Sequence, residues 1–217
     1  MDTLEFRKDY QSKLPKWYRG WRHLASTVLV LGTGSVIGLS RLRDADALDF
    51  ARFFAFLLFA NLFEYAFHRW VLHVPRPGLK KVYCIHTLEH HRYFTDKYPN
   101  FTGQNDIAMI LFPIWAPYLN FIVFLVVWQH IFAPIGWDKE GQILFGLANI
   151  YFLFYEVMHS THHLRPDHPF LKLRPIRYMR NHHIKHHDPR LMTTTNFAVI
   201  FPIFDYVFRT RRDEDAP

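Results

Sequence analysis

The sequence predicts an all-α, multi-pass membrane protein with about four transmembrane helices and a cytoplasmic, histidine-rich helical cap that holds a dimetal site. Two observations predict this class. Half of the 217 residues are apolar, yet the mean hydropathy is close to zero, so apolar segments must alternate with very polar ones. Of the 15 histidines, 12 lie in four clusters, and each cluster adjoins an apolar segment.

Length and composition fit one membrane domain. We expect a basic interfacial segment at residues 1–23, where Trp17, Tyr18 and Trp21 suit a membrane surface, followed by a single membrane domain at residues 24–217. Cys84 is the one cysteine in the sequence, which excludes an internal disulfide and a cysteine-rich metal site. Any bound metal is therefore expected to be held by nitrogen.

Four apolar runs come close to the roughly 20 residues that a helix needs to span a bilayer. They are predicted at residues 24–40, 50–67, 107–132 and 143–158. Pro113 and Pro117 should kink or break the third helix near its start. The later run at residues 196–208 is too short to span and is interrupted by Pro202 and Asp205, so we expect it to lie at the membrane interface.

Four spans place both termini and all four histidine clusters on one side of the membrane. Of the 26 Lys and Arg residues, 22 fall in residues 1–23, 68–106 and 159–217, which this topology places on that side. The positive-inside rule makes it cytoplasmic, in a bacterial inner membrane or the endoplasmic reticulum. Contacts with anionic membrane lipids account for basic residues beside apolar spans, so we do not expect nucleic-acid binding despite a pI near 9.5.

The spacing within the clusters indicates how the imidazoles meet, and neutral imidazole is a common ligand for transition metals. Residues four apart share a helix face, which pairs His159 with His163 and His86 with His90; His183 should likewise share a face with the doublet at 186–187. His68 and His73 are five apart, so we expect the helix to end or bend between them. Adjacent histidines suit either two ligands aimed at different ions or one ligand beside a residue that orients it by a hydrogen bond. Doublets that recur at three places favour a bridged pair of metals over a single ion.

Several other histidines and one short motif carry less weight. We interpret His23, His130 and His168 as core or surface residues, not as ligands. Glu156 and His159 form an E-x-x-H pair typical of di-iron carboxylate proteins, but that architecture needs two such pairs and further glutamates.

The four clusters are HRWVLH at 68–73, HTLEHH at 86–91, HSTHH at 159–163 and HHIKHH at 182–187. They resemble the histidine boxes of the fatty acid hydroxylase and sterol desaturase superfamily. The order of the boxes, the intervening two-span hairpin and the ending NFAVIFPIFDYVFRT are also similar, so the resemblance covers roughly residues 55–210. It implies a non-haem di-iron centre that uses O2 and two electrons to hydroxylate, or desaturate, a lipid or fatty acyl C–H bond.

The resemblance also implies which residues serve this centre, with no catalytic residue beyond it and no organic cofactor. The implied ligands are His68, His73, His86, His90, His91, His159, His163, His183, His186 and His187. The second box has three residues before its doublet where many family members have two, so His86 is the ligand that the resemblance supports least. We expect His162, His182, Glu64 and Glu156 to orient the ligands through hydrogen bonds.

The implied metal is iron, although all-histidine sites also accept zinc in purified protein. The chain carries no cytochrome b5-like segment, so we expect electrons from a separate donor of the cytochrome b5, ferredoxin or reductase type. Hydroxylation is favoured over desaturation because HRWVLH and the C-terminal ending look more like the hydroxylase branch.

Two other classes of function remain open. His86-Thr87-Leu88-Glu89-His90 spells H-x-x-E-H, the zinc-binding motif of inverted zincins, which would make the protein a membrane metallopeptidase. This motif leaves the other three clusters unexplained. A metal transporter or sensor without catalysis would need polar or histidine side chains within the spans, and the predicted spans contain almost none.

Overall fold

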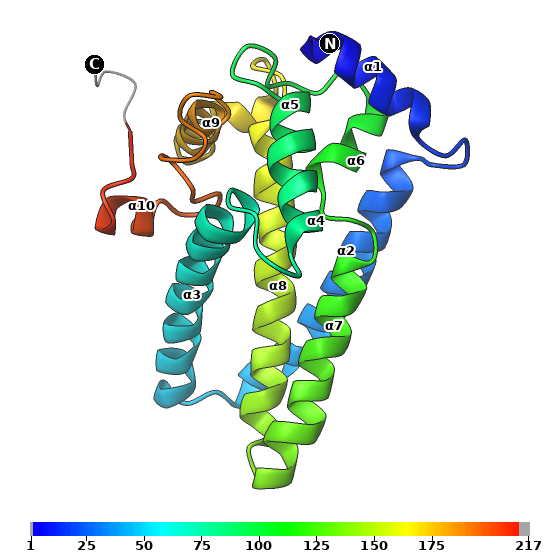
Figure 1. Cartoon of the computed structure of the whole chain (residues 1–217). Coiled ribbons are helices and arrows are strands. Elements are labelled where there is room, and N and C mark those ends of the chain that lie inside the picture. The colour runs from blue at the N-terminus through cyan, green and yellow to red at the C-terminus, as the bar shows by residue number, and fades with distance from the viewer. Residues whose placement is uncertain (1, 213–217) are drawn as a thin grey trace. The chain divides into compact units, whose positions relative to one another are not determined.

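The structure, a computed structural model, describes residues 2–212, and the chain divides into two compact units. The histidine unit comprises the described residues of Met1–Gly20, Asn61–Ile110 and Val157–Pro217, and the apolar unit comprises Trp21–Ala60 and Leu111–Glu156. The regular elements between residues 2 and 212 are all helical, and no strand occurs among them (Figure 1). The predicted all-α class is confirmed.

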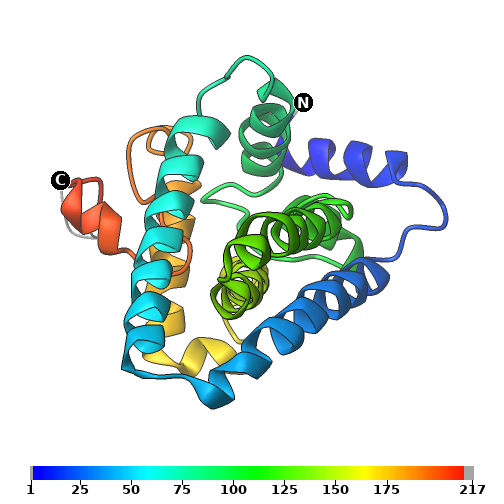
Figure 2. The ribbon, with the colours of Figure 1, turned by 90° about the horizontal axis from the view of Figure 1, so that it is seen from below.

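The apolar unit is built from stretches of four long helices. These are α2 (Gly20–Leu39), α3 (Ala47–Phe67), α7 (Ala116–Val127) and α8 (Asp138–His162). α2 and α8 approach closely because two glycines face each other: a Cβ added to Gly38 would lie 2.2 Å from the backbone of Gly146. α7 lies beside the first part of α8 (Figures 1 and 2), where the ring centroids of Phe121 and Phe145 are 5.0 Å apart.

Four helices of the described chain are long and apolar enough to cross a membrane. They cover Gly20–Arg43, Ala47–Leu72, Ala116–Ile135 and Asp138–His162. In the third, no residue of the most apolar 18-residue window is buried within the protein. Such a surface is expected only where lipid surrounds it. The four helices indicate a membrane protein and confirm the predicted number of spans.

The structure corrects some predicted boundaries. The third span begins at Ala116 and not at residue 107, because the short α6 (Ile107–Ile110) ends before Pro113 and a new helix starts beside Pro117. A π-helical turn, η5 (Trp128–Phe132), and the 3₁₀ turn η6 (Ala133–Ile135) complete that span. The fourth span begins at Asp138 and not at residue 143. Acidic residues in its first turn, Asp138 and Glu140, suit the positive end of a helix.

The histidine unit consists of shorter helices and turns around the ends of α3 and α8. Its elements are α1 (Thr3–Lys13), η2 (His68–Leu72), α4 (Lys80–Tyr83), η3 (Cys84–His90), α5 (His91–Tyr93), η4 (Gln104–Asp106), α6, η7 (Pro169–Lys172), α9 (Arg174–His186) and α10 (Ile203–Val207). A capping box between Asp2 and Glu5 fixes the start of α1. Tyr93, Phe94, Met109 and Ile110 form a buried core, against which Phe6 of α1 packs.

The C-terminal segment folds into the histidine unit. Phe197, Ala198 and Val199 are fully buried and Ile200 is nearly so, so the first part of the run at residues 196–208 does not present these side chains to lipid. These side chains are apolar because they pack inside the protein. The second part, around α10, does expose apolar side chains, among them Tyr206 and Val207.

Candidate metal centre

Two π-helical turns set the spacing of the first two boxes. η2 covers His68–Leu72 and η3 covers Cys84–His90. Hydrogen bonds from residue i to i+5 widen such a turn, so residues five apart come to lie on one face. His68 and His73 are therefore brought together, and the helix ends at Leu72, between them, as predicted. In the second box the same geometry brings His86 beside His91, with ring centroids 4.9 Å apart. The rings of His86 and His90 also stack, with centroids 5.2 Å apart, as predicted for side chains on one helix face.

The ten histidines implied as ligands form two groups of five. The first group is His68, His73, His86, His91 and His186, and the second group is His90, His159, His163, His183 and His187. All ten residues are buried, and within each group one ring nitrogen of every residue lies within 4.8 Å of the others. Each group therefore offers several nitrogens to a single ion.

The distances between ring nitrogens fit ligands of a shared ion. In the first group, the Nε2 atoms of His68 and His86 are 2.9 Å apart, as are those of His73 and His186. In the second group, Nε2 of His187 lies 3.0 Å from that of His183 and 3.2 Å from that of His90. Nitrogens at about 2.0–2.1 Å from one ion, with ligand angles between 90° and 109°, lie about 2.9–3.4 Å apart.

The tautomers explain why these short contacts need a cation. Nδ1–H of His90 donates to the carbonyl oxygen of Met109 at 2.6 Å, and that of His187 donates to the carbonyl of Phe94. A carbonyl only accepts hydrogen bonds, so in both neutral rings Nε2 carries a lone pair. These two lone pairs face each other across 3.2 Å. The contact is repulsive unless a positive ion lies between them.

The same pattern recurs in both groups. Nδ1–H of His68 donates to Phe197, that of His163 to Pro99 at 2.7 Å, and that of His186 to Thr195 at 2.8 Å, in each case to the backbone carbonyl. Nε2 of His163 is buried without a hydrogen-bond partner among the described residues. An unpartnered buried lone pair costs free energy, and a metal ion would satisfy it.

His73 obtains its orientation from a side chain. The hydroxyl of Thr87 donates to the carbonyl of Leu72 at 2.6 Å, so its oxygen is left to accept from Nδ1–H of His73 at 3.1 Å. The Nε2 lone pair of His73 then points to the other nitrogens of the first group.

Burial keeps the rings neutral. It lowers the pKa of His90 to about 4, and it lowers the pKa of His73 and His186 as well, with a further contribution from neighbouring histidines. Burial also lowers the pKa of His163 and of His187 well below the usual range. Neutral imidazole is the form that binds metal, so the sites are ready to bind at neutral pH.

The two groups adjoin each other, and two doublets connect them. His91 belongs to the first group and His90 to the second, and His186 and His187 are divided in the same way. The ring centroids of His91 and His187 are only 4.3 Å apart. The prediction that adjacent histidines serve different groups is thus met by these two doublets. In the other two, His163 and His183 belong to a group while His162 and His182 do not.

His162, His182 and Glu64 hold the C-terminal segment. Nε2–H of His162 donates to the carbonyl of Val199 at 2.9 Å, while Glu64 accepts from the N–H of Val199 at 2.6 Å. Nε2 of His182 lies 3.1 Å from the carboxylate of Asp205. These residues thus orient the backbone that in turn carries the partners of the box histidines. We expected these three residues to donate to or accept from the grouped histidines directly, but these hydrogen bonds connect them to the C-terminal segment.

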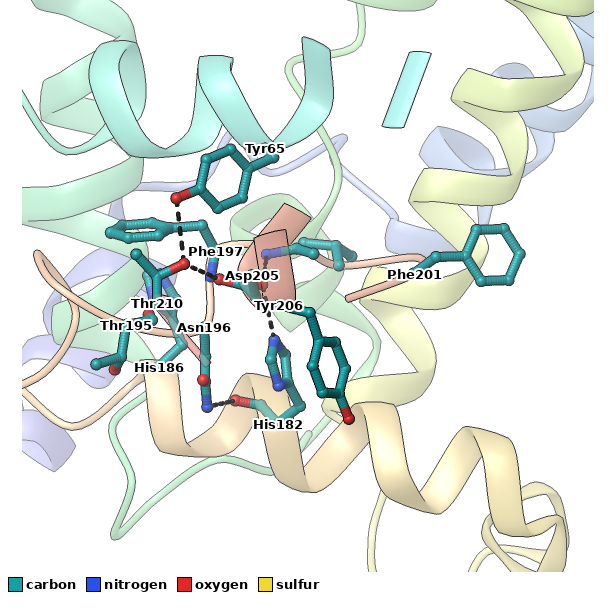
Figure 3. A network of polar contacts seen from close by, with 12 residues as sticks. Tyr65, His182, His186, Thr195, Asn196, Phe197, Phe201, Asp205, Tyr206 and Thr210 are labelled. Atoms are coloured by element: carbon teal, nitrogen blue, oxygen red, sulfur yellow. Dashed lines mark hydrogen bonds and ion pairs between the residues drawn. The ribbon is translucent and has the colours of Figure 1, made fainter. Parts of the chain in front are cut away.

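Asp205 is the centre of the network shown in Figure 3. Its two carboxylate oxygens accept hydrogen bonds from His182, from the Thr210 hydroxyl at 2.7 Å, and from the N–H groups of Phe197 at 2.9 Å and Ala198 at 2.8 Å. Burial opposes its charge, but these donors, His182 first, hold the pKa of Asp205 below its usual range.

The remaining candidates belong to neither group. Glu156, in the apolar unit, accepts from the N–H of Phe112 at 3.0 Å. Nε2 of His23 lies 3.1 Å from the carbonyl oxygen of that same Phe112. His130 and His168 belong to neither group, which agrees with the interpretation of these histidines as core or surface residues.

Sequence reasoning missed the residues that accept hydrogen bonds directly from the grouped histidines. Most of them act through backbone carbonyls, which leave no mark in the sequence. Two side chains did leave a signal in the sequence. Thr87 lies inside a histidine box, and Asp205 is an acidic residue within an apolar run, where it was interpreted only as an interruption of that run.

A sequence model of the fatty acid hydroxylase family matches residues 53–210. Searches of curated proteins and of solved structures found no match. The matched region is more than half of the chain and contains all four boxes, the ten grouped histidines and Asp205. The chain therefore belongs to the fatty acid hydroxylase family, within the superfamily of fatty acid hydroxylases and sterol desaturases.

Proposed function

We propose that this protein is a membrane-bound, O2-dependent hydroxylase of a lipid or fatty acyl chain, with one iron ion in each histidine group. The observation that carries the proposal is the set of buried, neutral imidazoles whose Nε2 lone pairs face one another at 2.9–3.3 Å. When bound, two iron ions would supply the activation of O2 and the oxidation of a lipid C–H bond. All-histidine sites also accept zinc, so purified protein can carry that metal instead.

The protein's own residues hold and shield this centre. The backbone carbonyls that accept from Nδ1–H fix each ring in the tautomer whose Nε2 binds metal. Burial of all ten histidines excludes bulk water from the space between the rings. We propose that the acyl chain reaches the centre from the bilayer, because two boxes, at 68–73 and 159–163, lie at the ends of apolar spans.

Both termini are proposed to lie in the cytoplasm together with the boxes. The three segments of the histidine unit are separated by pairs of candidate spans, yet they fold into one compact unit. Segments in mutual contact must share one side of the membrane, which supports an even number of spans between them. The 22 basic residues on that side favour the cytoplasm.

A cleft in the histidine unit is the docking site that we propose for a separate electron donor. Its volume is about 700 Å³, and its charged lining residues are Asp96, Arg180, Lys185, Asp188, Arg190 and Arg212. Four cations against two carboxylates favour a donor with an acidic surface. The cleft is also near the second group, since the N–H of Asp96 donates to the carbonyl of His187 at 3.3 Å.

The proposed reaction can be tested directly. Protein reconstituted with Fe(II), O2 and a reduced ferredoxin or cytochrome b5 system should convert an acyl lipid into a product heavier by one oxygen atom. With isotopically labelled O2 the product should carry the label. Activity should be lost without O2 or donor and in His91→Ala and His186→Ala, whereas His130→Ala should retain it. An unchanged lipid pool across acyl and sterol-like substrates would contradict the proposal, and a product lighter by two hydrogen atoms would indicate desaturation.

The geometry disfavours the peptidase alternative. An inverted zincin needs both histidines of H-x-x-E-H on one zinc ion, but His86 belongs to the first group and His90 to the second. A peptidase would also need neither O2 nor electrons, so the oxygen-free control above separates the two functions. Metal crossing a vesicle membrane without any lipid product would instead indicate the transporter.

A further inference from the structure

The second histidine group depends on one loop for its orientation. The carbonyl oxygen of Phe94 accepts from Nδ1–H of His187, and that of Pro99 accepts from Nδ1–H of His163. The Phe94 ring also packs on the ring of His163, with centroids 4.3 Å apart. The position of residues 94–99 therefore sets the direction of two ligands of this group.

Arg7 of α1 holds this loop from the other end of the sequence. Its Nε donates to the carbonyl of Tyr93 at 2.7 Å, and its two terminal nitrogens donate to the carbonyls of Tyr98 and of Asn100, the latter at 3.3 Å. These residues directly flank Phe94 and Pro99. The guanidinium carbon also lies 4.9 Å from the Phe94 ring centroid. Arg7 is 5% exposed, unusually little for an arginine.

The first histidine group depends in the same way on the C-terminal segment. The carbonyls of Thr195 and Phe197 accept from His186 and His68. Asp205 holds this stretch by accepting from the N–H groups of Phe197 and Ala198. Figure 3 shows this carboxylate together with Phe197, Thr210 and His182.

We propose that Arg7 and Asp205 are positioning residues that each set the metal affinity of one histidine group: Arg7 that of the second group, and Asp205 that of the first. The inference rests on the proposed role of the ten histidines as metal ligands. Arg7 lies outside the region that matches the family, residues 53–210. Arg7 thus acts on the second group from outside the matched region.

The chemistry of the two side chains explains why they suit this task. The planar guanidinium donates to three carbonyls at once, which the single ammonium of a lysine cannot do in the same geometry. The carboxylate of Asp205 accepts from four donors. An asparagine there would turn an NH2 group toward some of those donors. Loss of a residue that orients metal ligands typically lowers metal affinity about 10- to 100-fold.

Zinc binding can test the assignment, because it needs no catalytic activity. Two background variants isolate the groups: His68→Ala with His186→Ala disables the first, and His163→Ala with His187→Ala disables the second. Zinc affinity and stoichiometry would be measured by competition with a chromogenic chelator. Arg7→Met should weaken zinc binding about 10- to 100-fold where only the second group remains, and leave it unchanged where only the first remains. Asp205→Asn should give the reverse pattern.

Lys8→Met is the matched control, because it removes one positive charge from an exposed position of the same helix. It should not change zinc binding in either background. If Arg7→Met loses the helical circular dichroism of the parent, Arg7→Lys decides in its place, with the same selectivity expected. Equal effects of the Arg7 variant on both groups, or no effect on either, would overturn the inference. Absence of zinc binding in the parent protein would instead contradict the proposed ligand role.

Discussion

Thr87→Val offers a sharp test of how the first histidine group is oriented. The substitution keeps the shape of the side chain but removes the hydroxyl between the Leu72 carbonyl and Nδ1–H of His73. Thr87 is 6% exposed, so water is a poor substitute for the hydroxyl. A buried polar group left without a partner costs about 1–3 kcal/mol. At about 1.4 kcal/mol for each factor of ten, this cost corresponds to a metal site weaker by roughly 5- to 140-fold, a range that includes the effect of about 10- to 100-fold expected for a ligand-orienting residue.

The assay is zinc affinity of the first group, measured in the background with His163→Ala and His187→Ala. Thr27→Val is the matched control, since the Thr27 hydroxyl is equally buried but has no hydrogen-bond partner among the described residues. The control should leave zinc affinity unchanged. Equal zinc affinities for Thr87→Val and its parent would refute the argument, because they would show that the hydroxyl does not hold His73 in its binding tautomer.

Three further predictions concern other parts of the chain. In a Cys84→Ser background, cysteines introduced at Ala45 and Trp137 should react with an impermeant thiol reagent from outside the cell. Cysteines introduced at Ser12 and Asp167 should not react. The opposite labelling would contradict the proposed topology. Gly38→Ala should destabilise the fold by about 1–3 kcal/mol, because the added methyl overlaps the backbone of Gly146. Gly32→Ala should not, because a Cβ there meets no atom within 4 Å. Thermal unfolding in detergent checks both variants. Charge reversal by Lys185→Glu with Arg190→Glu should slow reduction of the metal centre by an acidic donor about 10-fold at low ionic strength and less at high ionic strength. Zinc binding should not change. A reduction rate that does not depend on these charges would place the donor elsewhere.

The sequence predicts the helices and the gathering of the histidines well for physical reasons that are local. A span must be apolar over a length fixed by the bilayer, so hydropathy alone locates the four helices, although it starts the third at residue 107 and not at Ala116. The density of imidazole likewise marks all ten histidines that the structure gathers into its two groups. Pro113 marks the break before the third span, although not where the new helix begins.

The division of the histidines between the groups could not be predicted from spacing. The π-helical turns at His68 and His86 have no residue signature, and α-helical periodicity places His86 beside His90 without showing that the two belong to different groups. The carbonyls of Phe94 and Phe197 serve through their backbone position, which depends on the tertiary fold. The role of Arg7 depends on a contact with residues more than 80 positions away, and its charge alone suggested only a membrane surface.

The π-helical turn at the second box has a consequence for insertions and deletions. A π turn accommodates one residue more than an α turn, so the three residues between His86 and His90 can present these side chains much as two residues would on a regular α-helix. The three-residue spacing of this box is therefore compatible with three histidines that all reach the two groups. Deleting Leu88, an exposed residue within the turn, should convert it to an α turn and keep the box functional, whereas a second inserted residue would rotate His90 and His91 out of their groups.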